Sequence, residues 1–239
     1  DTNEPEDVGG CFWGGPYSID NPESNFAYPD TGATYWHAKY SLPEGASLKL
    51  NGEFPYARYM SFNSYRQDNS PAFALRDQQI LANNGSINPF TQGAERNNDK
   101  RSYQIELAAG QAPIIPPNNI VYDYAQDNNG EARLLYRVYV PNKGKDATGG
   151  VGLPTPELTL TNGQVLKGQS ACDKLESEKE LVKIRDLEIS FQVETELWQQ
   201  QLNQKKLESL QKIEVVINQA IKEFAISENY DLILYQNAA

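Results

Sequence analysis

The sequence predicts a mainly β fold that is followed by one long α-helix and a short terminal strand. Residues 1–172 hold nearly all of the Gly, Pro and aromatic residues, in short alternating runs between turn signals, as all-β domains do. From Asp173 to Ala239 the sequence has no Gly or Pro, and Lys, Glu, Gln and Leu dominate. We therefore expect a β-rich domain over 1–172 and a helical region over 173–239.

The strands are predicted from runs in which successive side chains alternate in character. "ARYMSFNSY" places Met60 and Phe62 on one face and Tyr59 and Tyr65 on the other. "DNNGE" (127–131) is interpreted as a hairpin turn, because Asn and Gly tolerate positive φ. Strands in this number need two packed sheets or a barrel to cover their edges. The predicted strands are residues 33–40, 46–54, 57–65, 101–108, 118–125, 132–140 and 157–166.

The helical region carries an apolar stripe. Leu210, Ile213, Ile217 and Phe224 recur at steps of three and four once Ala220 is included, which is typical of a coiled coil or an interhelical contact. A helix over about 175–225 would be roughly 75 Å long and would need a partner helix to cover this stripe. We expect self-association or a different partner helix.

A terminal strand is predicted at "YDLILY" (230–235), which contains Leu232 and Leu234. A lone apolar strand leaves its backbone donors and acceptors unmet, so we expect it to pair with a neighbouring chain.

The charge of the chain excludes some classes of partner. Its 239 residues carry a formal net charge of −11, and the pI is about 4.6. A nucleic-acid binder needs a cationic face, and an anionic membrane surface attracts cations. No apolar run approaches the length of a membrane-spanning helix. We expect no nucleic-acid partner and no membrane span.

The two cysteines predict the compartment. Cys11 and Cys172 lie near the two ends of the β-rich domain. In the chain-entropy model, a disulfide that closes so large a loop stabilises the folded state by roughly 5 kcal/mol. The alternative is two free thiols in a reducing cytosol. We expect the disulfide, and we interpret the first residue, Asp1, as a processed N-terminus after removal of a signal peptide.

Residues 176–239 resemble the C-terminal part of the Skp/OmpH family of periplasmic chaperones. The marker is the helix end "INQAIKEFA" followed by "ENYDLILY". The resemblance implies a periplasmic address in a Gram-negative bacterium, trimerisation through residues 230–235, and unfolded outer-membrane proteins as partners. The family's N-terminal strand and outgoing helix have no counterpart in this sequence, where the β-rich domain stands instead.

Residues 9–173 are similar to an uncharacterised family of secreted bacterial proteins. The similarity rests on "NFAYPDTGATYWHAKYSLPEGASLKLNGEFPYARYMSFNSY" and "LLYRVYVPNKGKDATGGVGLPTPELTLTNGQVLKGQSAC". It implies a jelly-roll-like β-sandwich with a disulfide joining its ends, and it implies no catalytic residues.

A ligand surface is predicted from the dense aromatic residues and the arginines near them. Tyr, Trp and Arg suit the recognition of carbohydrates or peptides, whereas the alternative is a core with cross-strand aromatic pairs. The candidate residues are Trp36, His37, Arg58, Tyr59, Tyr65, Arg137 and Tyr139.

Catalytic and metal sites have weaker support. His37 is the one histidine, and a triad with Ser61 or Ser64 is conceivable, although no nucleophile motif accompanies it. "DYAQDNNGE" gathers four oxygen ligands for calcium without the EF-hand spacing. These four are Asp123, Asp127, Asn129 and Glu131.

The sequence thus favours an exported bacterial binding or assembly protein without catalysis or a cofactor, in which a Skp-like segment drives oligomerisation. Two alternatives stay open. One is a secreted hydrolase of glycans or esters with its site on the sandwich, for which paired carboxylates such as Glu53, Asp68 and Asp77 are available. The other is a structural subunit of a surface or filament.

Overall fold

The computed structural model describes residues 11–19, 30–125 and 130–229. The chain divides into two compact units, residues 1–183 and residues 184–239. We describe the two units separately.

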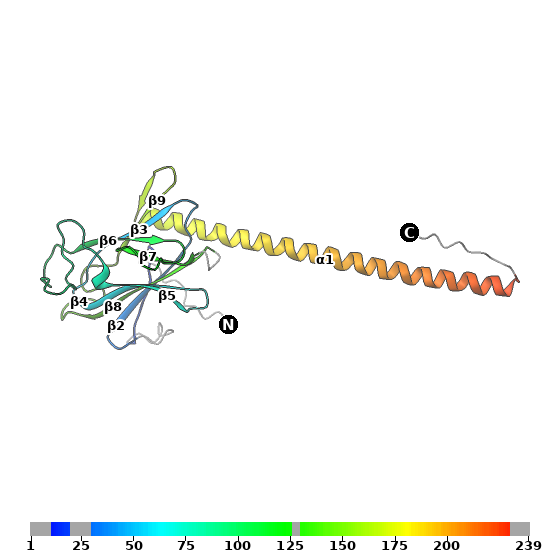
Figure 1. Cartoon of the computed structure of the whole chain (residues 1–239), viewed down its shortest axis with the longest axis horizontal. Coiled ribbons are helices and arrows are strands. Elements are labelled where there is room, and N and C mark those ends of the chain that lie inside the picture. The colour runs from blue at the N-terminus through cyan, green and yellow to red at the C-terminus, as the bar shows by residue number, and fades with distance from the viewer. Residues whose placement is uncertain (1–10, 20–29, 126–129, 230–239) are drawn as a thin grey trace. The chain divides into compact units, whose positions relative to one another are not determined.

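The first unit is built from two facing five-stranded sheets (Figure 1). In spatial order, the first sheet consists of β1 (Gly14–Tyr17), β2 (Ala33–Tyr40), β8 (Ala132–Pro141), β4 (Ala57–Tyr65) and β5 (Pro71–Arg76). The second sheet consists of β10 (Val165–Lys167), β9 (Thr155–Thr159), β3 (Ser47–Glu53), β6 (Ser102–Ala108) and β7 (Ile120–Tyr122). The strands pair antiparallel except for β6 and β7, which are parallel. The predicted mainly β sandwich with one long helix is confirmed.

The core lies between the sheets because one face of each strand is apolar. In the first sheet, Trp36 lies opposite Tyr136, which lies opposite Phe62 on its other side. The rings of Phe62 and Tyr136 stack with their centroids 4.9 Å apart. In the second sheet, Leu50 lies opposite Ile105. These residues belong to one continuous hydrophobic cluster that joins the two sheets.

Two predicted β segments are corrected by the structure. The run 157–166 is a hairpin of β9 and β10 instead of one strand, because the chain turns at Gly163, whose φ of +81° suits glycine. The segment 127–131 does not close a hairpin, because β7 belongs to the second sheet and β8 to the first. It therefore lies in the connection from β7 to β8, of which residues 126–129 lie outside the described ranges.

The long helix α1 (Gln169–Ser227) starts inside the sandwich unit. Its first turns bury Ala171 and Leu175 in the core cluster. Cys172, in the first turn, forms a disulfide with Cys11, so the predicted cross-link is confirmed. The cross-link attaches the start of the described N-terminal segment to the helix.

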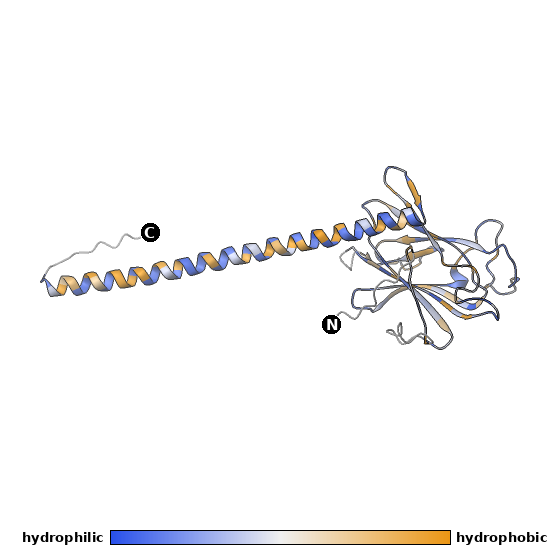
Figure 2. Cartoon of the chain, turned by 180° about the vertical axis from the view of Figure 1, so that it is seen from behind, coloured by the Kyte–Doolittle hydropathy of each residue, from blue (hydrophilic) through white to orange (hydrophobic). Residues whose placement is uncertain are grey.

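The second unit continues α1 from Ile184 to Ser227. Bands of apolar residues recur along the helix (Figure 2). Leu210, Ile213, Ile217 and Phe224 are all exposed in the single chain. The terminal strand predicted at 230–235, with Leu232 and Leu234, lies outside the described residues. Within the described ranges, no helix combines the length and the apolarity that a membrane crossing requires.

Candidate functional site

The outer face of the first sheet gathers tyrosines around one arginine. Because side chains alternate along a strand, the residues between the core positions of β2, β4 and β8 all point to this face. Arg137 on β8 lies beside Tyr35 on β2, and Tyr139 lies beside Tyr59 on β4. We name this surface the aromatic–arginine face and define it by Tyr35, Tyr59, Tyr65, Arg137 and Tyr139.

Arg137 is held at the centre of the face by two tyrosines. Its Nη2 donates a hydrogen bond to the hydroxyl of Tyr65. Its guanidinium carbon lies 5.4 Å from the centroid of the Tyr35 ring, within the range of a cation–π interaction. A planar cation between aromatic rings is suited to stack on, or donate to, a flat polar ligand.

A hydrogen-bond network fixes the tyrosines at the other end of the face. The hydroxyl of Tyr139 donates to Oδ2 of Asp30 at 2.7 Å and lies 3.2 Å from the hydroxyl of Tyr35. The backbone N–H of Asp30 donates to the Tyr35 hydroxyl at 3.0 Å. Burial, and then the hydrogen bonds with Tyr35 and Asp30, raise the pKa of Tyr139 well above its ordinary value. Tyr139 therefore stays neutral and acts as a hydrogen-bond donor.

The structure brings together five of the seven residues predicted for a ligand surface. His37, Tyr59, Tyr65, Arg137 and Tyr139 share the outer face of the first sheet. Tyr35 lies on the same side of β2 as His37, because the two are two residues apart in "ATYWHAKY". It is only 7% exposed, so it supports the face from beneath instead of offering it a free ring.

Trp36 and Arg58 do not belong to this face. The prediction for Trp36 is wrong, because its side chain points into the core and is only 4% exposed. Arg58 is exposed but precedes Tyr59 directly on β4, so it points to the opposite side of the sheet. The ligand surface is therefore built from the odd-numbered positions of β2, β4 and β8.

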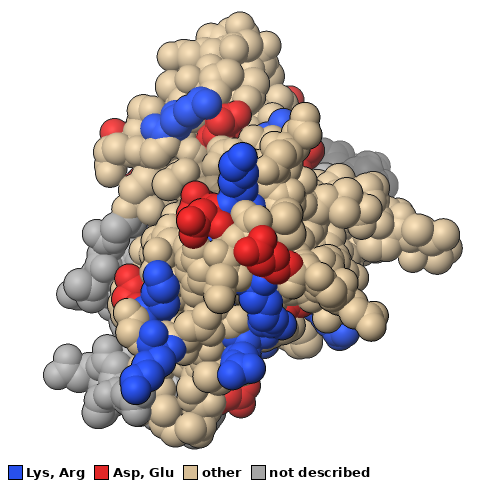
Figure 3. Space-filling model, turned by 90° about the vertical axis from the view of Figure 1, so that its left-hand side faces the viewer, with Lys and Arg blue, Asp and Glu red and all other residues tan. Residues whose placement is uncertain are grey.

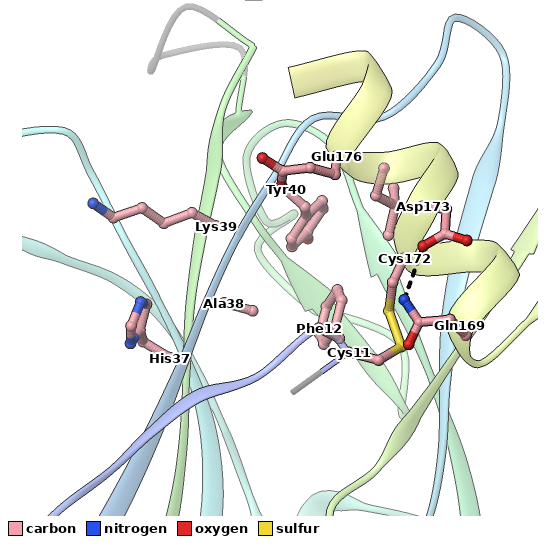
Figure 4. A pocket seen from close by; sticks show the side chains of 11 residues that line it. Cys11, Phe12, His37, Ala38, Lys39, Tyr40, Gln169, Cys172, Asp173 and Glu176 are labelled. Atoms are coloured by element: carbon pink, nitrogen blue, oxygen red, sulfur yellow. Dashed lines mark hydrogen bonds between the residues drawn. A yellow bond between two sulfur atoms is a disulfide. The ribbon is translucent and has the colours of Figure 1, made fainter. Parts of the chain in front are cut away.

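A pocket of about 300 Å³ lies between β2 and the first turns of α1. The disulfide and the rings of Phe12 and Tyr40 form one wall, whereas Lys39 and His37 point away from the helix (Figure 4). The first turns of α1 contribute Asp173 and Glu176, and Gln169 donates a hydrogen bond to Asp173 at 2.8 Å. The size suits a small molecule, and the lining carries both charge signs.

The geometry around His37 does not assemble the triad that the sequence left open. Ser61 lies on β4, which is separated from β2 by β8, and its Oγ accepts a hydrogen bond from Asn63 at 2.9 Å. Ser64 points to the core side, where its Oγ donates to the carbonyl of Tyr122 at 2.6 Å. The ring of His37 packs 5.3 Å from that of Tyr17. Neither serine shares a hydrogen bond with the histidine.

The candidate calcium ligands are described only in part. Asp123 is buried, and its two carboxylate oxygens accept hydrogen bonds from the Tyr40 hydroxyl and the Ala125 backbone N–H. Glu131 pairs with Arg133 at 3.3 Å. Asp127 and Asn129 lie outside the described residues. Among residues 11–19, 30–125 and 130–229, no three His, Cys, Asp or Glu side chains cluster in a way suited to a metal ion.

The carboxylates considered for a glycosidase are dispersed over the fold. Glu53 ends β3 in the second sheet, whereas Asp68 lies in the turn before β5 and accepts a hydrogen bond from the Ser70 backbone. Asp77 is buried in the 3₁₀ helix η2 (Asp77–Gln79), and burial raises its pKa. Glu53, Asp68 and Asp77 therefore belong to three different elements of the fold and do not form a pair of facing carboxylates.

Comparison with known proteins gives no family. No family model matches the chain, and no curated protein matches it. Among solved structures, an uncharacterised protein from Burkholderia cenocepacia aligns over 67% of this chain with 14% sequence identity and a TM-score of 0.36. The alignment spans 38% of that protein's length.

Proposed function

We propose that this chain is an exported, non-catalytic binding and assembly protein whose helix α1 associates with α1 of further copies of the chain. The observation that carries the proposal is the exposure of large apolar side chains along α1. Phe191 is 72% exposed, Leu202 68% and Phe224 60%. Covering a side chain of this kind contributes about 1.5–3 kcal/mol, and large exposed apolar surfaces mark association sites.

The apolar stripe follows an eleven-residue repeat. Phe191, Leu202, Ile213 and Phe224 are each eleven positions apart, and all four are large and apolar. Eleven residues make three turns of about 3.67 residues, close to the natural 3.6 of an α-helix, so the four side chains stay nearly in line. The repeat supports a nearly straight bundle with a slight right-handed twist instead of a left-handed coiled coil.

A second copy of the chain suits this stripe as the partner. The described residues include one α-helix, so no second helix among them covers the stripe. Two copies have the same repeat and remain in register along its full length. Residues 184–227 carry five Lys or Arg and seven Asp or Glu, so their net charge of −2 opposes association far less than the −11 of the whole chain would.

The sandwich supplies the binding function in this proposal. The aromatic–arginine face suits a carbohydrate or peptide, and assembly through α1 would present several copies of the face to one ligand and raise the avidity. The disulfide is in keeping with export to an oxidising compartment. The resemblance to the Skp/OmpH family supports a periplasmic address and unfolded outer-membrane proteins as a class of partner.

The test is the mass of the intact, oxidised chain in solution, measured by light scattering during size-exclusion chromatography. We expect a multiple of the 26.8 kDa chain mass. Leu202→Asn places an amide on the repeat and is expected to shift the chain towards the monomer. A wild-type chain that remains monomeric at all concentrations would contradict the proposal.

Leu207→Asn is the matched control. Leu207 is 62% exposed, close to the value for Leu202, but its eleven-residue neighbours Glu196 and Asn218 are polar. The chemical change and the helix propensity are the same at both positions, so only the position on the helix differs. We expect Leu207→Asn to keep the wild-type mass. Equal effects of the two substitutions would mean that association does not use the repeat.

A further inference from the structure

Arg101 is a buried cation whose donors are only partly used. It directly precedes β6, and its side chain is 2% exposed. Its Nη2 donates to the carbonyl of Arg96 at 3.1 Å, but Nε and Nη1 have no hydrogen-bond partner among the described residues. No carboxylate in the described part of the chain forms an ion pair with it. Burial of a charge is costly unless it is paired and hydrogen-bonded.

A small cavity adjoins this guanidinium. Arg101 lines it together with Pro55, Tyr56, Phe90 and Arg96, and its volume is about 10 Å³, close to what one water-sized group fills. A water molecule in this cavity would supply an acceptor but no negative charge. An anionic oxygen would supply both, which is what a buried arginine needs.

Two further cations surround the same aromatic rings. The ring of Tyr56 has the Arg101 guanidinium 3.5 Å from its centroid and the Lys145 ammonium 4.5 Å from it. The Arg96 guanidinium lies 5.8 Å from the centroid of Phe90. On the face that Figure 3 shows, Lys and Arg side chains are interspersed with Asp and Glu side chains.

The neighbouring acids are engaged elsewhere. Asp99 Oδ1 accepts the hydrogen bond of the Tyr56 hydroxyl at 2.8 Å. Asp146 Oδ1 accepts hydrogen bonds from the Thr148 hydroxyl and from the backbone N–H groups of Gly150 and Thr148. These bonds, together with the Lys145 ammonium, hold the pKa of Asp146 below its ordinary value. Neither carboxylate forms an ion pair with Arg101, so within the described residues its Nε and Nη1 have no acidic acceptor.

We propose that the Arg101 cavity binds the carboxylate of a small acidic ligand. The guanidinium is planar and matches a planar carboxylate, and the proline and aromatic walls form a narrow slot for it. As it stands, the cavity holds only one water-sized group, so one carboxylate oxygen fills it and the rest of the ligand needs Arg96 to move. Arg96, whose side chain is exposed, forms the rim and is the group that moves to admit the ligand.

The experiment measures thermal unfolding of the intact, oxidised chain during titration with sodium acetate, with sodium chloride and sodium sulfate at the same ionic strength as comparisons. We expect acetate to raise Tm saturably and beyond both comparisons, and Arg101→Met to lose this response. Arg101→Lys keeps the charge without the planar fork and is expected to weaken the response about tenfold. Arg58→Met removes an exposed arginine and the same charge, so it should respond like the wild type.

An equal response to the three salts would overturn the proposal, because the cavity would then hold water. A response that persists in Arg101→Met would also overturn it. If that variant does not fold, a response in Arg101→Lys as strong as that of the wild type overturns it instead. Sodium glucuronate and N-acetylaspartate, titrated in the same way, distinguish a sugar acid from an acidic peptide by which of them binds more tightly.

Discussion

Cys11 and Cys172 are 161 residues apart in the sequence, and their Cα atoms lie 5.6 Å apart across the disulfide. The bond joins the N-terminal segment to the first turn of α1, so it encloses the whole sandwich. In the chain-entropy model, a cross-link over so many residues reduces the freedom of the unfolded chain by about 5 kcal/mol. We predict that Cys11→Ser/Cys172→Ser lowers the free energy of unfolding by about 3–5 kcal/mol, measured by urea denaturation.

The wild-type chain treated with a reductant is the control for this pair of substitutions. Both samples lack the cross-link, so their unfolding midpoints should agree. A double variant as stable as the oxidised wild type would show that the cross-link does not limit the unfolded ensemble.

The sequence was sufficient to predict the bounds of two central strands. β2 and β4 begin and end at the predicted residues, because turn signals rich in Gly, Pro, Asp and Asn flank "ATYWHAKY" and "ARYMSFNSY". β1 and β5 were missed, and both are edge strands of the first sheet. Their segments "GGPY" and "PAFALR" contain proline, which a strand tolerates at an edge but which weakens the strand signal.

The sequence predicts which residues of a strand share a face, but it does not predict which of the two faces carries the candidate site. In β2, Tyr35 and Trp36 are both aromatic, so alternation shows that they point to opposite sides but not which side is the core. Arg101 could not be identified in advance, because arginine is usually exposed and its burial depends on the loops packed over it. The packing of the two sheets decides which side of β2 is the core, and the packing of loops decides the burial of Arg101.

The tyrosine network of the aromatic–arginine face should contribute to stability. Tyr139→Phe removes the hydroxyl that donates to Asp30 and contacts Tyr35, and we expect it to lower the free energy of unfolding by about 1 kcal/mol. Tyr59→Phe is the matched control, because its hydroxyl forms no hydrogen bond within the described residues and its ring packs against the same Tyr139 ring. Urea denaturation of the two variants should therefore differ. Equal losses would exclude the hydroxyl as the cause.

Asp123 should give the chain a measurable pH dependence. Burial raises its pKa above the ordinary 3.8, and the hydrogen bonds from Ala125 and Tyr40 only partly oppose this. The folded state therefore binds the proton more tightly than the unfolded state. Its contribution to stability is fully present below pH 3.8 and is lost as the pH rises through the raised pKa.

Asp123→Asn isolates this contribution, because an amide does not titrate and its oxygen still accepts from the Tyr40 hydroxyl. Urea denaturation at a series of pH values should show the stability of the wild type falling, relative to that of the variant, from about pH 4 towards neutrality. Parallel profiles for the two proteins would mean that Asp123 has the same pKa in the folded and unfolded states.

Gly149 lets its loop pack closely against Pro55 and Tyr56, so its replacement should lower the free energy of unfolding. Its φ is +69°, its carbonyl accepts the N–H of Tyr56, and a Cβ at this position would lie 2.6 Å from the Cβ of Pro55. Gly144 has a φ of +82° but open space around it, so Gly144→Ala bears the left-handed backbone penalty alone, about 1 kcal/mol. We predict that Gly149→Ala costs a further 1–3 kcal/mol or so, because the prolyl ring and the Tyr56 backbone must both shift. Thermal unfolding of the two variants checks this, and similar losses would show that Pro55 and Tyr56 yield at little cost.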